Sequence, residues 1–123
     1  MEATIANAVP HSHGREVLNE LRPLSRELRH AIPDVYKGFA SLHEGAFAPG
    51  ALDSKTKELL AFAIGVSVRC DGCIASHAEA AARAGATRQE AAEAIGVAIL
   101  MGGGPATIYG PRAYDAFCEF TEN

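Results

Sequence analysis

The chain has 123 residues, which suits one domain with a modest core of its own. Hydrophobic residues make up 48% of it, yet there is no tryptophan and aromatic residues contribute only 7%, so alanine and other small residues supply much of the apolar content. Such a composition favours closely packed helices, with part of the apolar surface covered by another subunit. The 11 basic residues are scattered and the net charge is −4, which excludes nucleic acid as an expected partner.

The start of the chain, MEATIANAVPHSHG, lacks the basic residues and apolar stretch of a signal peptide. The longest apolar run, LLAFAIGVSV at residues 59–68, is far shorter than the roughly 20 residues that a membrane span needs. We therefore expect a cytoplasmic protein without membrane contact. Because thiols are kept reduced in that compartment, the three cysteines are a poor disulfide scaffold, and a close pair indicates catalysis, redox chemistry or metal binding.

The first elements are predicted from apolar spacing. Residues 1–13, with His11 and His13, are expected to form a flexible tail. From Gly14 onward, leucine and valine residues recur at helical spacing on one face, and Pro23 predicts a kink or break. A second helix is predicted to begin at Pro33, where the fixed φ of proline is tolerated, and to end before the Pro-Gly pair at 49–50.

The third predicted helix has Asp53 or Ser54 as its N-cap and continues to about residue 68. Its second half is apolar on nearly every side, which is typical of a helix that is buried all round. A fourth helix is predicted from about Asp71 to Gly85, a residue type suited to the left-handed position after a helix.

A capping box of Thr87 and Glu90 predicts the start of a fifth helix, which continues to Met101. The run Gly-Gly-Gly-Pro at 102–105 breaks it, and a sixth helix is predicted from about Ala106. The glycines do not fit a phosphate loop, since no Lys-Ser/Thr pair follows them. With no alternating strand pattern, the sequence predicts a single all-α domain of about six helices over residues 14–123.

The chemistry is concentrated in CDGCIASH, residues 70–77. At the start of a helix, unpaired N–H groups and the positive end of the helix dipole stabilise a thiolate, which is the reactive form of cysteine. The spacing of Cys70 and Cys73 also allows their sulfurs to bond to each other after one has been oxidised. Asp71 opposes thiolate formation and Arg69 favours it, so the sequence leaves the balance between them open.

Two further groups lie within reach of the cysteines. His77 follows Cys73 by four residues, on the same helix face, and an imidazole there can exchange a proton with the sulfur. Glu58 precedes Cys70 by twelve residues, or about 18 Å of helix. If the third and fourth helices form an antiparallel hairpin, the offset between Glu58 and His77 falls to about 7–8 Å, which two side chains can span, with or without a water. This predicts the order Glu58, His77, Cys73.

Other interpretations of the same residues remain open. Cys70, Cys73, His77 and Glu58 are four potential zinc ligands, but structural zinc sites usually draw on two Cys/His pairs, and the chain has no second pair. The cysteines could also be inert buried thiols. Cys118, among aromatic residues of the last helix, is most simply a core or interface thiol.

Taken together, KELLAFAIGVSVRCDGCIASHAEAAARAGAT and QEAAEAIGVAILMGGGPA resemble the carboxymuconolactone decarboxylase superfamily, within it the alkyl hydroperoxidase D-like branch. The resemblance extends from about Leu52 to Gly110, roughly half the chain. It implies an orthogonal all-α bundle in which a central antiparallel helix pair carries the cysteines. It also implies a homo-oligomer, with trimers and hexamers common.

The same resemblance implies a peroxide-reducing centre. Cys73 would be the peroxidatic thiolate that passes through a sulfenic acid, and Cys70 the resolving partner and proton donor that closes a Cys70–Cys73 disulfide. Glu58 and His77 would form the proton relay. Well-studied peroxidase members carry a second histidine just before the second cysteine, whereas this chain has Gly72 there.

We therefore expect a thiol-dependent peroxidase or disulfide oxidoreductase without a bound cofactor or metal. Its partners would be a hydroperoxide and an external dithiol of lipoyl or thioredoxin-like type. Two rival hypotheses are a lactone decarboxylase that uses Glu58 and His77 as acid and base, and a non-enzymatic redox sensor in which the disulfide is a switch.

Overall fold

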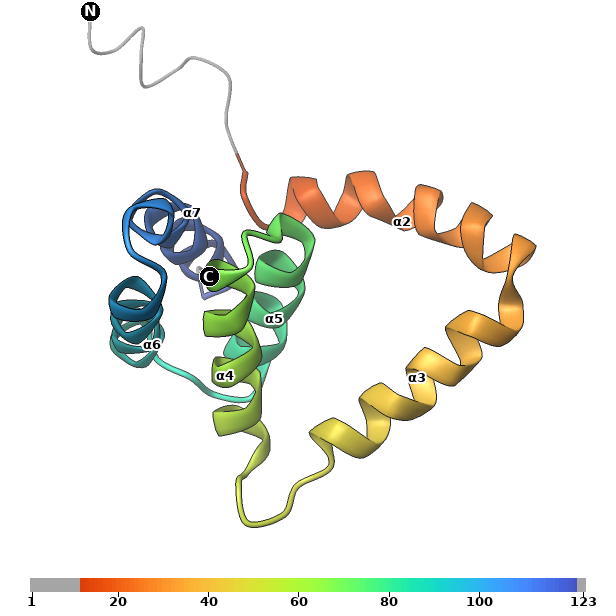
Figure 1. Cartoon of the computed structure of the whole chain (residues 1–123), viewed down its shortest axis with the longest axis horizontal. Helices are drawn as coiled ribbons and strands as arrows, with labels where there is room; N and C mark the ends of the chain where they lie inside the picture. Colours follow the sequence, from red (N-terminus) through yellow and green to blue (C-terminus); the bar gives the residue numbers. More distant parts are fainter. Residues whose placement is uncertain (1–11, 122–123) are drawn as a thin grey trace, which may run out of the picture.

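The computed structural model describes residues 12–121. Its helices form two parts, of which one has a buried core and the other has none. Within that range there are six helices and no strand, as the sequence predicts. We call α4–α7 the body and α2–α3 the arm. In Figure 1 the arm extends from the body as a V, and its second helix returns toward the start of α4.

The body is built on small side chains. Its helices are α4 (Ser54–Ser67), α5 (Asp71–Arg83), α6 (Arg88–Gly102) and α7 (Gly104–Phe120). Its largest fully buried side chains are Phe62, Val66 and Phe117, and most other core positions are alanine. Gly110 allows a close crossing of α6 and α7, because a Cβ there would lie 2.9 Å from Ile95 Cγ2. Short side chains thus let the helices approach closely, as the composition suggests.

The arm consists of α2 (Arg15–Ala31) and α3 (Pro33–Phe47), and neither helix has a buried residue. The predicted apolar face of the first helix is present, but Leu24 and Leu28 on it are exposed. Pro23 does not break α2, which continues through it. The far part of the face that periodicity assigned to a core therefore lacks a cover in a single chain. The prediction that the third helix is buried all round is also wrong, because Leu60 and Ile64 of α4 are exposed.

The predicted helix ends agree closely with the structure. Asp53 is the N-cap of α4, and Thr87 and Glu90 form the capping box of α6. Hydrogen bonds from Thr56 are the largest cause of a pKa of Asp53 below its ordinary value. The last two helices are separated by Gly103 alone, so the break is shorter than the four-residue run predicted.

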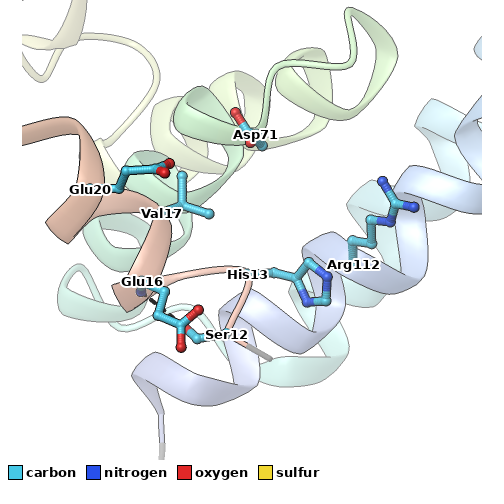
Figure 2. A pocket seen from close by; sticks show the side chains of 7 residues that line it. All are labelled: Ser12, His13, Glu16, Val17, Glu20, Asp71 and Arg112. Atoms are coloured by element: carbon cyan, nitrogen blue, oxygen red, sulfur yellow. Dashed lines mark hydrogen bonds between the residues drawn. The ribbon is translucent and has the colours of Figure 1, made fainter. Parts of the chain in front are cut away.

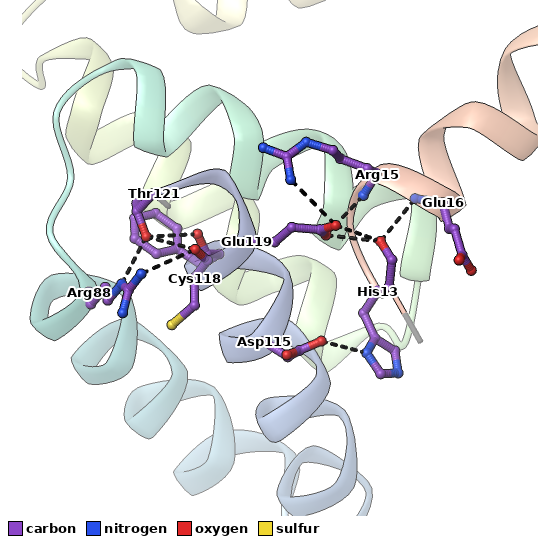
Figure 3. A network of polar contacts seen from close by, with 10 residues as sticks. His13, Arg15, Glu16, Arg88, Asp115, Cys118, Glu119 and Thr121 are labelled. Carbon is purple, nitrogen blue, oxygen red and sulfur yellow. Dashed lines mark hydrogen bonds and ion pairs between the residues drawn. The ribbon is translucent and has the colours of Figure 1, made fainter. Parts of the chain in front are cut away.

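A polar network joins the start of α2 to the end of α7 (Figure 3). The Ser12 hydroxyl donates to both carboxylate oxygens of Glu119 at 2.9 Å, and His13 Nδ1 lies 2.9 Å from Asp115 Oδ2. These two residues belong to the predicted N-terminal tail, whereas residues 1–11, including His11, lie outside the described range. The network fixes where the arm leaves the body.

Candidate active site

The turn between α4 and α5 positions the first cysteine. Arg69 has a φ of 58°, in the left-handed region that glycine usually occupies after a helix. Its N–H bonds to the Val66 carbonyl, and the Cys70 N–H bonds to the Gly65 carbonyl at 3.0 Å. This is the double hydrogen-bond pattern of a Schellman motif, and it ends α4 immediately before Cys70.

Cys70 then begins the next helix. Its sulfur is the N-cap of α5 and accepts a hydrogen bond from the Cys73 backbone N–H at 3.2 Å. The two cysteines form a disulfide, with a Cα–Cα distance of 5.2 Å inside the usual range for such bonds. Cys73 is exposed and Cys70 only half-buried. The pair thus lies at a helix N-terminus, as the sequence predicts, and Cys73 is the more exposed of the two residues.

Close packing of α4 on α5 supports this arrangement. Gly65 is buried, and a Cβ there would lie 3.4 Å from the Cβ of Cys73 and 3.4 Å from Ile74. Gly72 faces the arm instead, because a Cβ there would lie 2.9 Å from Leu21 Cδ1 on α2. The absence of a side chain at Gly72 is therefore associated with the contact between α2 and the start of α5.

The hairpin of α4 and α5 brings Glu58 to His77. Their Oε1 and Nδ1 atoms lie 2.8 Å apart, a direct contact that needs no intervening water. Both side chains are partly buried, with 14% of Glu58 and 17% of His77 exposed. Because a carboxylate can only accept, the His77 Nδ1 carries the proton, and Nε2 is the nitrogen left to act as a base. Within residues 12–121, the His77 ring makes no hydrogen bond to either cysteine sulfur.

The arm adds two rings that the sequence analysis did not identify. Phe47 at the end of α3 stacks on His77, with ring centroids 5.3 Å apart, and His43 one turn earlier stacks on Phe47 at 4.5 Å. The His43 and His77 rings lie 6.2 Å apart and are inclined by only 12°. The i, i+4 spacing of His43 and Phe47 was visible in the sequence, but the helix that they face was not.

Lys57 holds these rings in place. Its ammonium donates to the carbonyls of Ala46 and Ala48, at 3.0 and 2.6 Å, at the end of α3. The next residue along α4 is Glu58, which binds the ring nitrogen of His77 directly. Lys57 acts on the same imidazole indirectly, because it anchors the segment that supplies Phe47.

Other features of the described residues contribute no ligand to this site. No cluster of three or more metal-binding side chains occurs among residues 12–121. A pocket of about 820 Å³ opens beside the first turn of α5, and Figure 2 shows that its side chains come from residues 12–13, α2, α5 and α7. It includes Asp71 but none of the four predicted site residues. Cys118 is half-buried on α7. No helix in the described range is long and apolar enough to cross a membrane.

Comparisons with known proteins agree with this fold. A 39% identical protein from Legionella pneumophila, of the carboxymuconolactone decarboxylase family, has a solved structure with a TM-score of 0.84, covering 88% of this chain and 96% of that one. A solved structure of a family member from Thermotoga maritima is 30% identical and has a TM-score of 0.73, covering 85% of this chain and 88% of that one. An involvement in antioxidative response has been suggested for that protein.

Uncharacterised relatives extend the comparison. A protein of Cupriavidus necator is 35% identical over 81% of this chain and 88% of its own, and one encoded in the cox locus of Paracoccus denitrificans is 38% identical over 71% and 78%. The sequence model described as "Carboxymuconolactone decarboxylase family" matches residues 33–118, more than half the chain. The chain belongs to the carboxymuconolactone decarboxylase family.

Proposed function

We propose that this chain is a thiol-dependent peroxidase of the alkyl hydroperoxidase D-like branch, which reduces hydroperoxides through Cys70 and Cys73. The observation that carries the proposal is the 2.8 Å contact of Glu58 with His77, one helical turn beyond an exposed cysteine that has a disulfide partner. The antioxidative link of the Thermotoga relative is consistent with it.

The first step is attack by Cys73. Its exposure allows a peroxide to approach, and His77 Nε2 accepts the thiol proton while Glu58 stabilises the resulting imidazolium. The thiolate bonds to the terminal oxygen of ROOH, the O–O bond breaks, and alkoxide leaves. The products of this step are Cys73 sulfenic acid and, after protonation of the alkoxide, ROH.

The second step is disulfide formation. The Cys73 N–H that bonds to the Cys70 sulfur stabilises a Cys70 thiolate, which is the form that attacks the sulfenic acid. The S–O bond breaks, and the hydroxide that leaves becomes water by taking up the proton that Cys70 released on becoming a thiolate. Two thiols and ROOH thus yield a disulfide, ROH and water. An external dithiol, of lipoyl or thioredoxin-like type, returns the disulfide to two thiols.

Thiol titration after addition of tert-butyl hydroperoxide to the reduced protein tests this function. We expect two thiols to be lost per peroxide consumed. Cys73→Ser should abolish peroxide consumption, and Glu58→Gln should slow it by about 10²-fold, since general base catalysis contributes effects of this size. Cys118→Ser is the matched thiol control and should react normally. If both site thiols remain free while peroxide persists, the proposal is wrong.

Lactone decarboxylation is a second candidate, favoured by the family to which the chain belongs. The Glu58–His77 pair could serve as acid and base without any thiol. A Cys70→Ser/Cys73→Ser double variant separates the two functions. It should keep decarboxylation of a small acidic lactone, but it should lose all peroxide reduction.

We also propose that the working form is a homo-oligomer. Five large apolar side chains of the arm are at least half exposed in one chain: Leu24, Leu28, Val35, Phe39 and Leu42. A second copy would cover this surface, and trimers or hexamers are expected from the resemblance. Sedimentation should give a mass above that of one chain, and Leu42→Glu should lower it. A protein that sediments as a single chain at high concentration would contradict this.

A further inference from the structure

We propose that His43 is a second catalytic imidazole of the thiol site, which protonates the alkoxide that leaves when a hydroperoxide is reduced. This rests on the proposed peroxidase function and assigns a residue to one step of it. In the proposed reaction, one proton leaves the Cys73 thiol and another must reach the alkoxide. His77 is suited to the first transfer, because Glu58 occupies its Nδ1 and leaves Nε2 as a base.

The position of His43 suits the second transfer. Its ring centroid lies 6.2 Å from that of His77, and the two rings are nearly parallel. The two rings therefore lie close enough together to act on one bound peroxide. Phe47 contacts both rings, so the separation is set by packing on each side.

The surroundings of His43 leave its nitrogens available. Among residues 12–121, its ring makes stacking contacts but no hydrogen bond. In a single chain the side chain is exposed and lines a pocket of about 510 Å³ on the arm. His77, by contrast, is only 17% exposed and is bonded to Glu58. The two imidazoles thus differ in their exposure and in their hydrogen bonding.

The proton balance divides between the two rings. His77 accepts the Cys73 proton as the S–O bond forms and the O–O bond breaks. His43, in its protonated form, donates to RO⁻ and yields ROH. His77 then loses its proton to water and His43 regains one, so the thiol, the peroxide and the two imidazoles need no further reactant.

Two oxidants with different leaving groups distinguish an acid from a structural ring. The leaving group of tert-butyl hydroperoxide is a strongly basic alkoxide that needs a proton, whereas peracetic acid releases acetate, which needs none. We would measure the rate at which the reduced protein loses its Cys70 and Cys73 thiols to each oxidant by stopped flow. His43→Phe keeps the stacked ring and removes the acid. His30→Phe, on the exposed surface of α2, is the matched control.

The expected result is a loss of about 10²-fold in the rate with tert-butyl hydroperoxide for His43→Phe, and a change of less than about twofold with peracetic acid. His30→Phe should alter neither rate. Equal slowing with both oxidants, or no slowing with either, would overturn the inference while leaving the peroxidase function in place. An unmodified protein that reacts with neither oxidant would refute the proposed function and His43's role with it.

Discussion

The body buries a core of its own, whereas neither helix of the arm has a buried residue. In the body, Phe62 and Phe117 are fully buried and their rings meet at 6.1 Å. In the arm, Phe39 is 63% exposed although it lies on an apolar helix face. Periodicity therefore identifies a face that needs a partner, but it does not say whether the partner belongs to the same chain. The arm nevertheless contributes to the site, through the rings that it places on His77.

The largest expected effect separates the two parts by stability. Phe62→Ala should lower the free energy of unfolding by about 3–5 kcal/mol, because it removes a fully buried ring and leaves a cavity among small side chains. Phe39→Ala should change it by no more than about 0.5 kcal/mol in a single chain. Urea denaturation at low protein concentration measures both.

The outcome for the second variant also reports on assembly. If Phe39→Ala is neutral at low concentration but lowers the sedimented mass at high concentration, the arm is an interface between copies. Comparable losses for the two variants at low concentration would contradict the division into body and arm.

A smaller effect is expected where the arm meets the body. Lys57→Met removes the two hydrogen bonds to Ala46 and Ala48. We expect α3 to open more easily by about 1 kcal/mol, since a charged donor contributes more than a neutral one but this site is partly solvated. Backbone amides of α3 should then exchange hydrogen about fivefold faster, while those of α5 should be unaffected. Lys37→Met, on exposed surface of α3, is the matched control.

The features that could be predicted from the sequence lie mainly in the body. Helix ends were predictable wherever a local signal marks them, as with Asp53 and the Thr87–Glu90 box. The meeting of Glu58 and His77 could be estimated because both belong to one hairpin, whose geometry depends only on helix rise. The catalytic roles assigned to these residues and to the cysteines stay predictions.

The contribution of the arm to the site was not predictable. His43 and Phe47 reach His77 from a helix 30 residues or more away in the sequence, and no local pattern specifies how two such helices meet. Likewise, the short break at Gly103 depends on how α6 and α7 pack, since three consecutive glycines permit several boundaries. Non-local packing is therefore what the sequence leaves undetermined in this protein.

Within the body, the turns after α4 and α5 have the same hydrogen-bond pattern but a different residue type at the left-handed position. Gly85 follows α5 with a φ of 95° and Arg69 follows α4 with a φ of 58°. Arg69→Gly should stabilise the protein by about 0.5–1 kcal/mol. Glycine adopts the left-handed conformation without the steric cost of a Cβ, but it also loses more conformational entropy on folding, which offsets part of the gain. Gly85→Ala should destabilise it by about 1 kcal/mol. Thermal denaturation measures both, and Arg69→Ala controls for the lost charge.

The smallest expected effect depends on pH and again contrasts body with arm. In the body, the Thr87 N–H bonds to Glu90 and, with Lys55 beside it, holds the pKa of that carboxyl below its ordinary value of 4.5. A carboxyl whose pKa is lower in the folded state stabilises the fold above its unfolded pKa, and that contribution is lost as pH falls through the folded pKa. Glu90→Gln should therefore have a lower melting temperature than the unmodified protein near pH 6.

The difference in melting temperature should narrow as the pH falls below 4.5, because the unmodified Glu90 becomes protonated and resembles its amide replacement. Glu44→Gln on exposed surface of the arm, whose carboxylate makes no hydrogen bond or ion pair within residues 12–121, should show no such trend. If the difference in melting temperature between Glu90→Gln and the unmodified protein does not change as the pH falls, the charge of the Glu90 carboxylate does not contribute to stability.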